Sequence, residues 1–213
     1  MDKDKLLKIL IIIIAIIFFL LGVYSIYKFI IINKIYNKMA EYVALENFSM
    51  KVIDSENSSG SIEMYYKDGI GKMIVKENTY TWTDGEEAYL IDEENKKAQK
   101  LSFESSLLVS NEAVGSMIPG YSKNLIERFF LAGNISTSVR IKNYEGIKYY
   151  VITTNEEETK TIWFKYDSLL PSQASIEIGD IKKTYNYNIT FEKLRDEDVK
   201  KPSLEEYEIL EKE

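Results

Sequence analysis

The sequence predicts an α+β protein: one membrane-crossing helix, then an antiparallel sheet of about eleven strands with a helical insertion. Three observations predict this class. Residues 9–27 form an apolar stretch without a charge. From Phe48 onward, short runs alternate with a period of two residues and are separated by Gly, Asp, Asn and Ser. Near residues 111–133 this alternation gives way to helical spacing, and then it returns.

Residues 9–27 predict a transmembrane helix, because at 1.5 Å per residue they span about 28 Å, close to the hydrocarbon thickness of a bilayer. The stretch is longer than the apolar region of a signal peptide, and no small-residue cleavage site follows closely. A buried core helix, apolar on every side, would need a much larger protein around it. We therefore expect an uncleaved anchor.

Topology follows from weaker features. Lysines flank both ends of the apolar stretch equally, so the positive-inside rule does not decide the orientation. A lysine-led apolar segment is typical of export, and long downstream domains translocate largely regardless of charge. We expect residues 1–33 to be an anchor with a short cytoplasmic tail in the cell membrane. Residues 34–213 would then form one domain outside the cytoplasm.

The elements after the anchor follow from periodicity. Residues 34–48 predict a helix with a stripe that packs on the sheet or on a partner helix, formed by Ile35, Met39, Tyr42 and Val43. Six strand-like runs follow up to residue 103. Residues 111–118 and 121–133 have helical spacing, and Gly133 supplies a stop. Five more strand-like runs then lead to a charged tail or loosely attached strand after residue 194.

Two turns fix which residues share a face. An Asp84-Gly85 two-residue turn would pair Thr83 with Glu86 and Tyr80 with Tyr89. One face of that hairpin would then carry four large side chains: Tyr80, Trp82, Tyr89 and Ile91. A Gly179-Asp180 turn would pair Ile178 with Ile181 and Ala174 with Tyr185. In this second hairpin the turn and the apolar pattern predict the same register.

The composition limits the chemistry. The chain has 213 residues and contains neither cysteine nor histidine. Disulfides, Cys- or His-ligated metals and histidine-based nucleophile systems are therefore excluded. The net charge of −7 is uneven: residues 1–38 carry +4 and the remainder carries −11, which argues against nucleic-acid binding. The acidic clusters fall at predicted turns without the spacing of a calcium loop, so we expect no catalytic residue, metal or cofactor, although a carboxylate hydrolase stays an alternative.

Three segments resemble the lipoprotein-carrier superfamily, the LolA/LolB-like and RseB-like half-barrels. TWTDGEEAYLIDEENKKAQKL is similar to its aromatic strand, Asp-Gly turn and following strand. WFKYDSLLPSQASIEI resembles its strand, acidic turn, Leu-Pro and next strand, and KKPSLEEYEIL resembles its C-terminal end. The resemblance implies a strongly curved sheet that cups helices, with an apolar cavity for acyl chains. A transmembrane anchor departs from that family and favours sensing or local hand-off over shuttling.

The expected function is non-catalytic binding of a lipid acyl chain or a lipidated protein at the membrane. Tyrosine outnumbers phenylalanine 16 to 9, which favours a cavity or a wet rim, since a buried hydroxyl needs a partner. The alternative is a protein-interaction or assembly module on the same scaffold, with a solid core and no ligand. The cavity candidates are Met64, Tyr66, Tyr80, Trp82, Tyr89, Ile91, Phe129, Trp163, Tyr185 and Tyr187.

Overall fold

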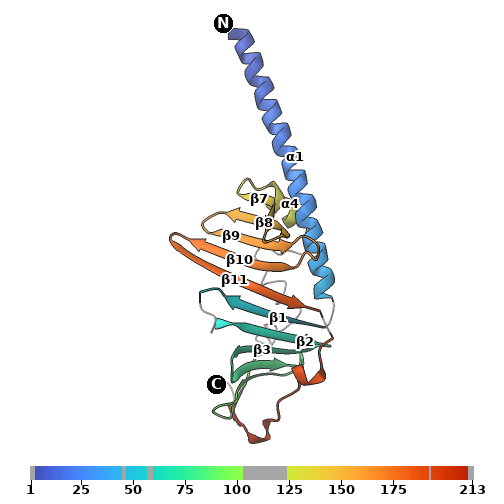
Figure 1. Cartoon of the computed structure of the whole chain (residues 1–213), viewed down its shortest axis with the longest axis vertical. Coiled ribbons are helices and arrows are strands. Elements are labelled where there is room, and N and C mark those ends of the chain that lie inside the picture. Colours follow the sequence, from blue (N-terminus) through green and yellow to red (C-terminus); the bar gives the residue numbers. More distant parts are fainter. Residues whose placement is uncertain (1–2, 45–46, 57–59, 103–123, 192, 211–213) are drawn as a thin grey trace.

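A computed structural model describes residues 3–44, 47–56, 60–102, 124–191 and 193–210. Helix α1 (Lys3–Val43) is continuous and rises well beyond the sheet at its N-terminal end (Figure 1). The predicted helix over residues 34–48 is therefore an extension of the apolar helix, which ends at Val43. The predicted helical segment 111–118 lies outside the described residues.

In the described part of the chain, twelve strands form one open, curved sheet, as the sequence predicted apart from the strand number. The first half contributes β1 (Asn47–Asp54), β2 (Ile62–Lys67), β3 (Ile70–Lys76), β4 (Thr79–Thr83), β5 (Ala88–Asp92) and β6 (Lys97–Lys100). The second half contributes β7 (Thr137–Tyr144), β8 (Ile147–Asn155), β9 (Thr159–Lys165), β10 (Pro171–Ile178) and β11 (Ile181–Thr190). β12 (Glu208–Leu210) follows the short 3-10 helices η3 (Asp196–Val199) and η4 (Leu204–Glu206).

The strand order is β12-β6-β5-β4-β3-β2-β1-β11-β10-β9-β8-β7, so β1 and β11 join the two halves at the centre of the sheet. All pairs are antiparallel except β12 with β6. β7 is one edge of the sheet, at the level where α1 leaves the domain (Figure 1). The sheet has two faces: we call the one on which α1 packs the inner face, and the opposite one the outer face.

The C-terminal hairpin has the predicted register. Ile178 pairs with Ile181 and Ala174 with Tyr185, around a turn in which Gly179 has a positive φ of 57°. A left-handed backbone at the first turn position is what a glycine permits at low cost. The predicted turn and the alternating pattern therefore agree with the structure.

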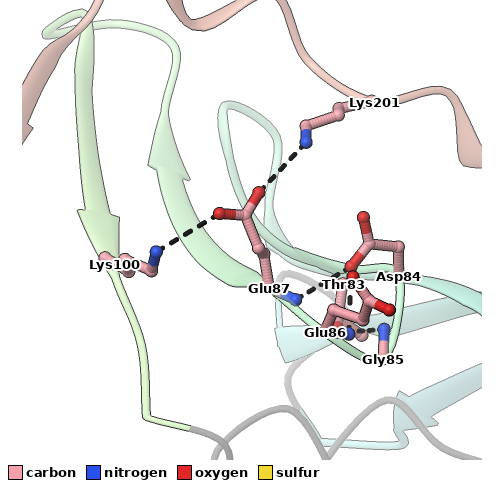
Figure 2. Close-up of polar contacts among 7 residues, drawn as sticks. All are labelled: Thr83, Asp84, Gly85, Glu86, Glu87, Lys100 and Lys201. Carbon is pink, nitrogen blue, oxygen red and sulfur yellow. Dashed lines mark hydrogen bonds and ion pairs between the residues drawn. The ribbon is translucent and has the colours of Figure 1, made fainter.

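The register predicted for the Asp84-Gly85 hairpin is wrong by two residues. Thr83 pairs with Ala88 and Tyr80 with Ile91, around a four-residue loop from Asp84 to Glu87. Figure 2 shows the cause: Asp84 Oδ1 accepts hydrogen bonds from the backbone N–H groups of Glu86 and Glu87, at 3.1 and 2.8 Å. Because a two-residue shift preserves the side-chain alternation, the predicted sharing of one face is still confirmed.

The last part of α1 and a second helix, α4 (Leu125–Gly133), cover the inner face of β7–β10. The Asn124 side chain caps α4 by accepting from the Ile126 N–H at 2.9 Å, and the helix ends at Gly133 as predicted. The buried residues of α1 in this core are Ile31, Ile32, Ile35, Tyr36 and Met39. α1 therefore crosses residues 33 and 34, the predicted limit between anchor and domain, without a break.

Candidate ligand-binding site

The ten predicted cavity residues do not line one surface. Met64, Tyr66, Tyr185 and Tyr187 lie on the inner face, whereas Tyr80, Trp82, Tyr89, Ile91 and Trp163 lie on the outer face. Phe129 lies on α4. The expectation of one cavity that contains all ten is therefore wrong. β4 is buried on both sides, so its alternation could not show which side faces the helices.

Over β7–β10 the inner face is filled by protein. Ile32, Ile35 and Met39 of α1 are fully buried against this part of the sheet, where Phe164 of β9 is also fully buried. A recess of about 190 Å³ lies beside them, lined by residues that include Tyr36, Ile152 and Ile162. Ligand pockets typically hold about 300–1,000 Å³, so this part of the sheet carries a solid core.

Over β1–β3 the inner face carries a row of methionines. The registers place Met50 of β1 opposite Met64 of β2, and Met64 opposite Met73 of β3. We call these three residues the methionine row. Unbranched thioether side chains adapt their shape easily, so such a row suits an apolar chain of variable form. The sequence analysis named only Met64, although the alternation in NFSMKVID and GKMIVKE could have placed the other two.

Aromatic rings border the methionine row. Tyr66 stacks on Phe48 with ring centroids 5.6 Å apart, and Phe191 stacks on Tyr42 of α1 at 4.4 Å. Tyr187 packs both against the core over β7–β10 and against the residues around the methionine row. Its burial raises the pKa of its hydroxyl to about 12. Tyr187 is therefore neutral at physiological pH, and this border of the row carries no charge.

The outer-face aromatic cluster is covered by the C-terminal segment. We call residues 195–210 the C-terminal segment, which brings Leu204 and Tyr207 against Tyr80, Trp82, Tyr89 and Ile91. The Trp82 indole Nε1–H donates to the backbone oxygen of Val199 at 3.0 Å. Burial also raises the pKa of Tyr80 above its ordinary range. These four predicted cavity residues therefore form a closed core.

An ion-pair bridge fastens the same segment beside the β4–β5 loop. Glu87 accepts from Lys201 at 3.1 Å and from Lys100 of β6 at 3.2 Å (Figure 2). The two ammonium groups, Lys201 first, hold the pKa of the Glu87 carboxyl below its ordinary value. The bridge links the chain after η3 to the β4–β5 loop and to β6.

Trp163 lines a groove on the outer face of the second half. The groove has a volume of about 420 Å³ and is lined by Tyr144, Tyr149, Trp163, Ser172, Gln173 and Asn186. Tyr149 meets Trp163 edge-on at 5.6 Å, and Lys142 Nζ lies 5.1 Å from the Trp163 ring centre. The groove is open and mixed in polarity, in contrast to the methionine row. Within the described ranges, no group of three or more Asp or Glu side chains is arranged to hold a metal ion.

Fold and site together define a class: a curved antiparallel half-barrel with an adaptable apolar row on its inner face and one long apolar helix at its N-terminal end. By length and composition, α1 is the one helix in the described chain that could cross a membrane, and its most apolar window is not buried in the protein. The alternative of a buried core helix is therefore wrong.

Solved structures resemble this chain to different degrees. An uncharacterised conserved protein from Thermus thermophilus is 5% identical, with a TM-score of 0.54 over 84% of this chain and 98% of that one. LprF from Mycobacterium bovis is 8% identical (TM-score 0.41; 74% and 91% covered). A LolA superfamily protein from Nitrosomonas europaea is 10% identical (TM-score 0.23; 73% and 88% covered). Neither family models nor curated protein sequences match this sequence.

At such identities the likeness is one of fold. Three segments of the sequence resemble the LolA/LolB-like and RseB-like superfamily, as described above. The fold implied by that resemblance, a curved antiparallel sheet with helices against one face, is the fold of this chain.

Proposed function

We propose that this protein is a membrane-anchored, extracytoplasmic binding protein that holds an apolar chain against the methionine row. The bound ligand would be a lipid acyl chain or the acyl group of a lipidated protein. The protein would carry out no catalysis on it. The observation that supports this is the cross-strand alignment of Met50, Met64 and Met73. The row lies beyond the buried stripe of α1, and Met50 and Met64 are 3% and 0% exposed, so a bound chain would have to displace what covers them.

The anchor would keep the row near the membrane without placing it at the bilayer surface, because four strands lie between β1 and β7, the edge beside the apolar span. α1 would hold the domain at the membrane, and residues 34–213 would lie outside the cytoplasm. A tether of one helix favours a sensor or a local acceptor of acyl chains. Because the chain lacks cysteine, an Ile178→Cys variant tests the topology: a membrane-impermeant maleimide should label it in intact cells. Labelling that requires cell lysis would contradict the proposed orientation.

The alternative function is a protein-interaction or assembly module with a solid core. It is favoured by the complete filling of the β7–β10 half, where α1 and Phe164 leave no space of ligand size. On this reading the methionine row would be ordinary core.

A photo-crosslinking experiment separates the two functions. Full-length protein in lipid nanodiscs is incubated with a diazirine fatty acid, irradiated and mapped by peptide mass spectrometry. Binding at the row should give crosslinks in β1, β2 and β3. Met73→Trp, which narrows the row, should reduce them several-fold. Ile74→Trp is the matched control, because Ile74 is the next residue of β3 but packs with the outer-face cluster.

The contrary result is equally clear. Crosslinks that are confined to α1, or that are unchanged in Met73→Trp, would reject ligand binding at the methionine row. The assembly module would then be the better account of the fold.

A further inference from the structure

α4 exposes an apolar arc that the site described above does not use. Leu125, Ile126, Phe129 and Phe130 are all more than half exposed, with Phe130 at 69%. At 100° per residue these four side chains fall within an arc of about 140° that carries no charged residue. Arg128 lies outside this arc and Ala132 at its border, and both are buried. Ile135, just after the helix, is 91% exposed. We call these five residues the α4 patch.

α4 runs antiparallel to α1, with its C-terminal end toward the apolar span. Near its N-terminal end, Arg128 Nη1 donates to Asn33 Oδ1 at 2.9 Å and to Asn37 Oδ1 at 2.6 Å. Beyond its C-terminal end, the backbone oxygen of Asn134 accepts from Lys28 Nζ at 2.8 Å. Ile135 therefore lies near the level of Lys28, the first charge after the stretch 9–27.

The domain meets α1 within that charge-free stretch. The Tyr24 hydroxyl accepts from the Val139 N–H at 3.3 Å and lies 3.5 Å from the Val139 oxygen, at the edge strand β7. Lys28 is turned into the protein, where it is 2% exposed. No flexible linker separates the span from the sheet, so the edge that carries β7 must lie at the level of the bilayer surface.

The α4 patch continues the apolar surface of the span. Ile26 and Ile30 of α1 are both about 60% exposed, so the solvent side of α1 stays apolar past Lys28. Phe29 of α1 contacts Phe129 of α4 edge-on, with ring centroids 5.8 Å apart. Two antiparallel helices thus share one uncharged surface, and α1 places it at the membrane.

We propose that the α4 patch is a second membrane contact, which inserts into the interface of the bilayer that α1 crosses. This rests on the proposed anchoring by α1. An exposed apolar arc of this size is costly in water, whereas an amphipathic helix at a bilayer interface buries its apolar face among acyl chains. The contact would hold the domain on the membrane at two points and fix the tilt of the sheet.

Site-directed spin labelling tests the proposal, because the chain has no native cysteine. Single-cysteine variants at Phe130, Ile135, Ile178 and Ile17 are labelled in the full-length protein in nanodiscs of phosphatidylcholine and phosphatidylglycerol. Accessibility to oxygen and to a water-soluble nickel complex then reports depth. Phe130 and Ile135 labels should be several-fold less accessible to nickel than the Ile178 label, which is at the β10–β11 turn.

The Ile17 label separates the two proposals. If Ile17 is in lipid while Phe130 and Ile135 are as open to nickel as Ile178, the second contact is rejected and the anchor stands. If Ile17 is itself open to nickel, the anchor is rejected. Concentration-dependent spin–spin broadening at Phe130 would assign the patch to a second copy of the chain and overturn the membrane contact.

A matched pair of variants removes the apolar surface. Ile126→Ser together with Phe130→Ser should raise the nickel accessibility of the Ile135 label toward that of Ile178. Ile178→Ser together with Ile181→Ser removes as many exposed apolar residues at a remote turn and should leave the Ile135 label protected. All four positions are at least half exposed, so circular dichroism should show native folding in both variants. An unchanged Ile135 depth in the first, natively folded variant would overturn the proposal.

Discussion

Trp82 joins the last part of the chain to strands of the first half. It is 1% exposed, and its indole N–H bonds the backbone of Val199, which lies 117 residues later. A large ring buried on the outer face also explains why the C-terminal segment packs there. At this position the side chain supports the fold, and the ligand proposal does not depend on it.

Trp82→Ala should therefore reduce stability without affecting acyl crosslinking at the methionine row. Loss of a buried tryptophan costs about 3–5 kcal/mol in the free energy of unfolding. Trp82→Phe keeps most of the packing and should cost about 1 kcal/mol for the lost hydrogen bond. Denaturant unfolding measures both values. Equal stability of the Ala variant and the native chain would contradict the closed outer-face core.

At the scale of elements, α4 depends on its contact with α1. Arg128 is 5% exposed and bridges Asn33 and Asn37, so α4 is held by a buried cation that has two amide acceptors. A helix as short as α4 is marginal in isolation, and tertiary contacts must supply its stability. The α4 patch is therefore positioned by α1.

Arg128→Ala should release α4 from α1, with a loss of roughly 2–4 kcal/mol from charged hydrogen bonds and packing. Hydrogen–deuterium exchange should show faster exchange in Leu125–Gly133 than in the sheet. Arg140→Ala is the matched control, because Arg140 is an exposed arginine on neighbouring β7. If α4 exchanges at the same rate in both variants, the bridge does not hold the helix.

The C-terminal segment should loosen in acid. Glu87 and Asp196 both have a pKa below the ordinary value, because Lys201 and Lys67 donate to them and so join the segment to the sheet and its β4–β5 loop. A group whose pKa is lowered by folding stabilises the fold above its unfolded pKa, and this contribution is lost as pH falls through the folded value. The contribution is therefore complete at neutral pH and disappears below the ordinary values of 4.5 for Glu and 3.8 for Asp.

Trp82 fluorescence reports the release of the C-terminal segment. It is measured in a Trp163→Phe background, because the chain has two tryptophans and this substitution leaves Trp82 as the emitter. Emission should shift to the red as pH falls below about 4, and Glu87→Gln should produce part of the shift at neutral pH. An emission maximum that stays constant through the carboxylate range would show that the ion pairs do not hold the segment.

Local patterns predicted the strands and the faces within each hairpin. The Gly179-Asp180 hairpin was right because turn chemistry and one-sided burial agree. The Asp84-Gly85 register was wrong because the Asp84 side chain stabilises a longer loop. The assignment of Trp82 to the cavity failed because β4 is buried on both faces. Its outer face is covered by the C-terminal segment, which lies far away in the sequence, so the local pattern of β4 could not predict this cover.

At the scale of the whole molecule, the apolar stretch and the part of α1 that packs on the sheet form one continuous helix. α1 contacts the domain from Tyr24 to Met39. The Tyr24 hydroxyl accepts from the Val139 N–H and Lys28 donates to the Thr137 oxygen, both on β7, and Ile32 and Met39 are fully buried. The division into residues 1–33 and 34–213 remains a prediction about function. The stability of the domain depends on buried residues of α1 both before residue 33 and after residue 34.

A fragment that begins at Lys34 should be much less stable than one that begins at Tyr24. It lacks Ile31 and Ile32, and burial of one isoleucine contributes about 1.5–3 kcal/mol. Thermal unfolding of the two fragments in mild detergent measures the difference. Equal melting temperatures would show that the first buried turns of α1 are dispensable.

The central pairing of β1 with β11 has a consequence for biosynthesis. A ribosome that has released β1 must still make more than a hundred residues before Ile181–Thr190 emerges. Until then β1 presents unsatisfied peptide groups, which are a template for intermolecular pairing. Premature termination before residue 181 should consequently yield an aggregation-prone product.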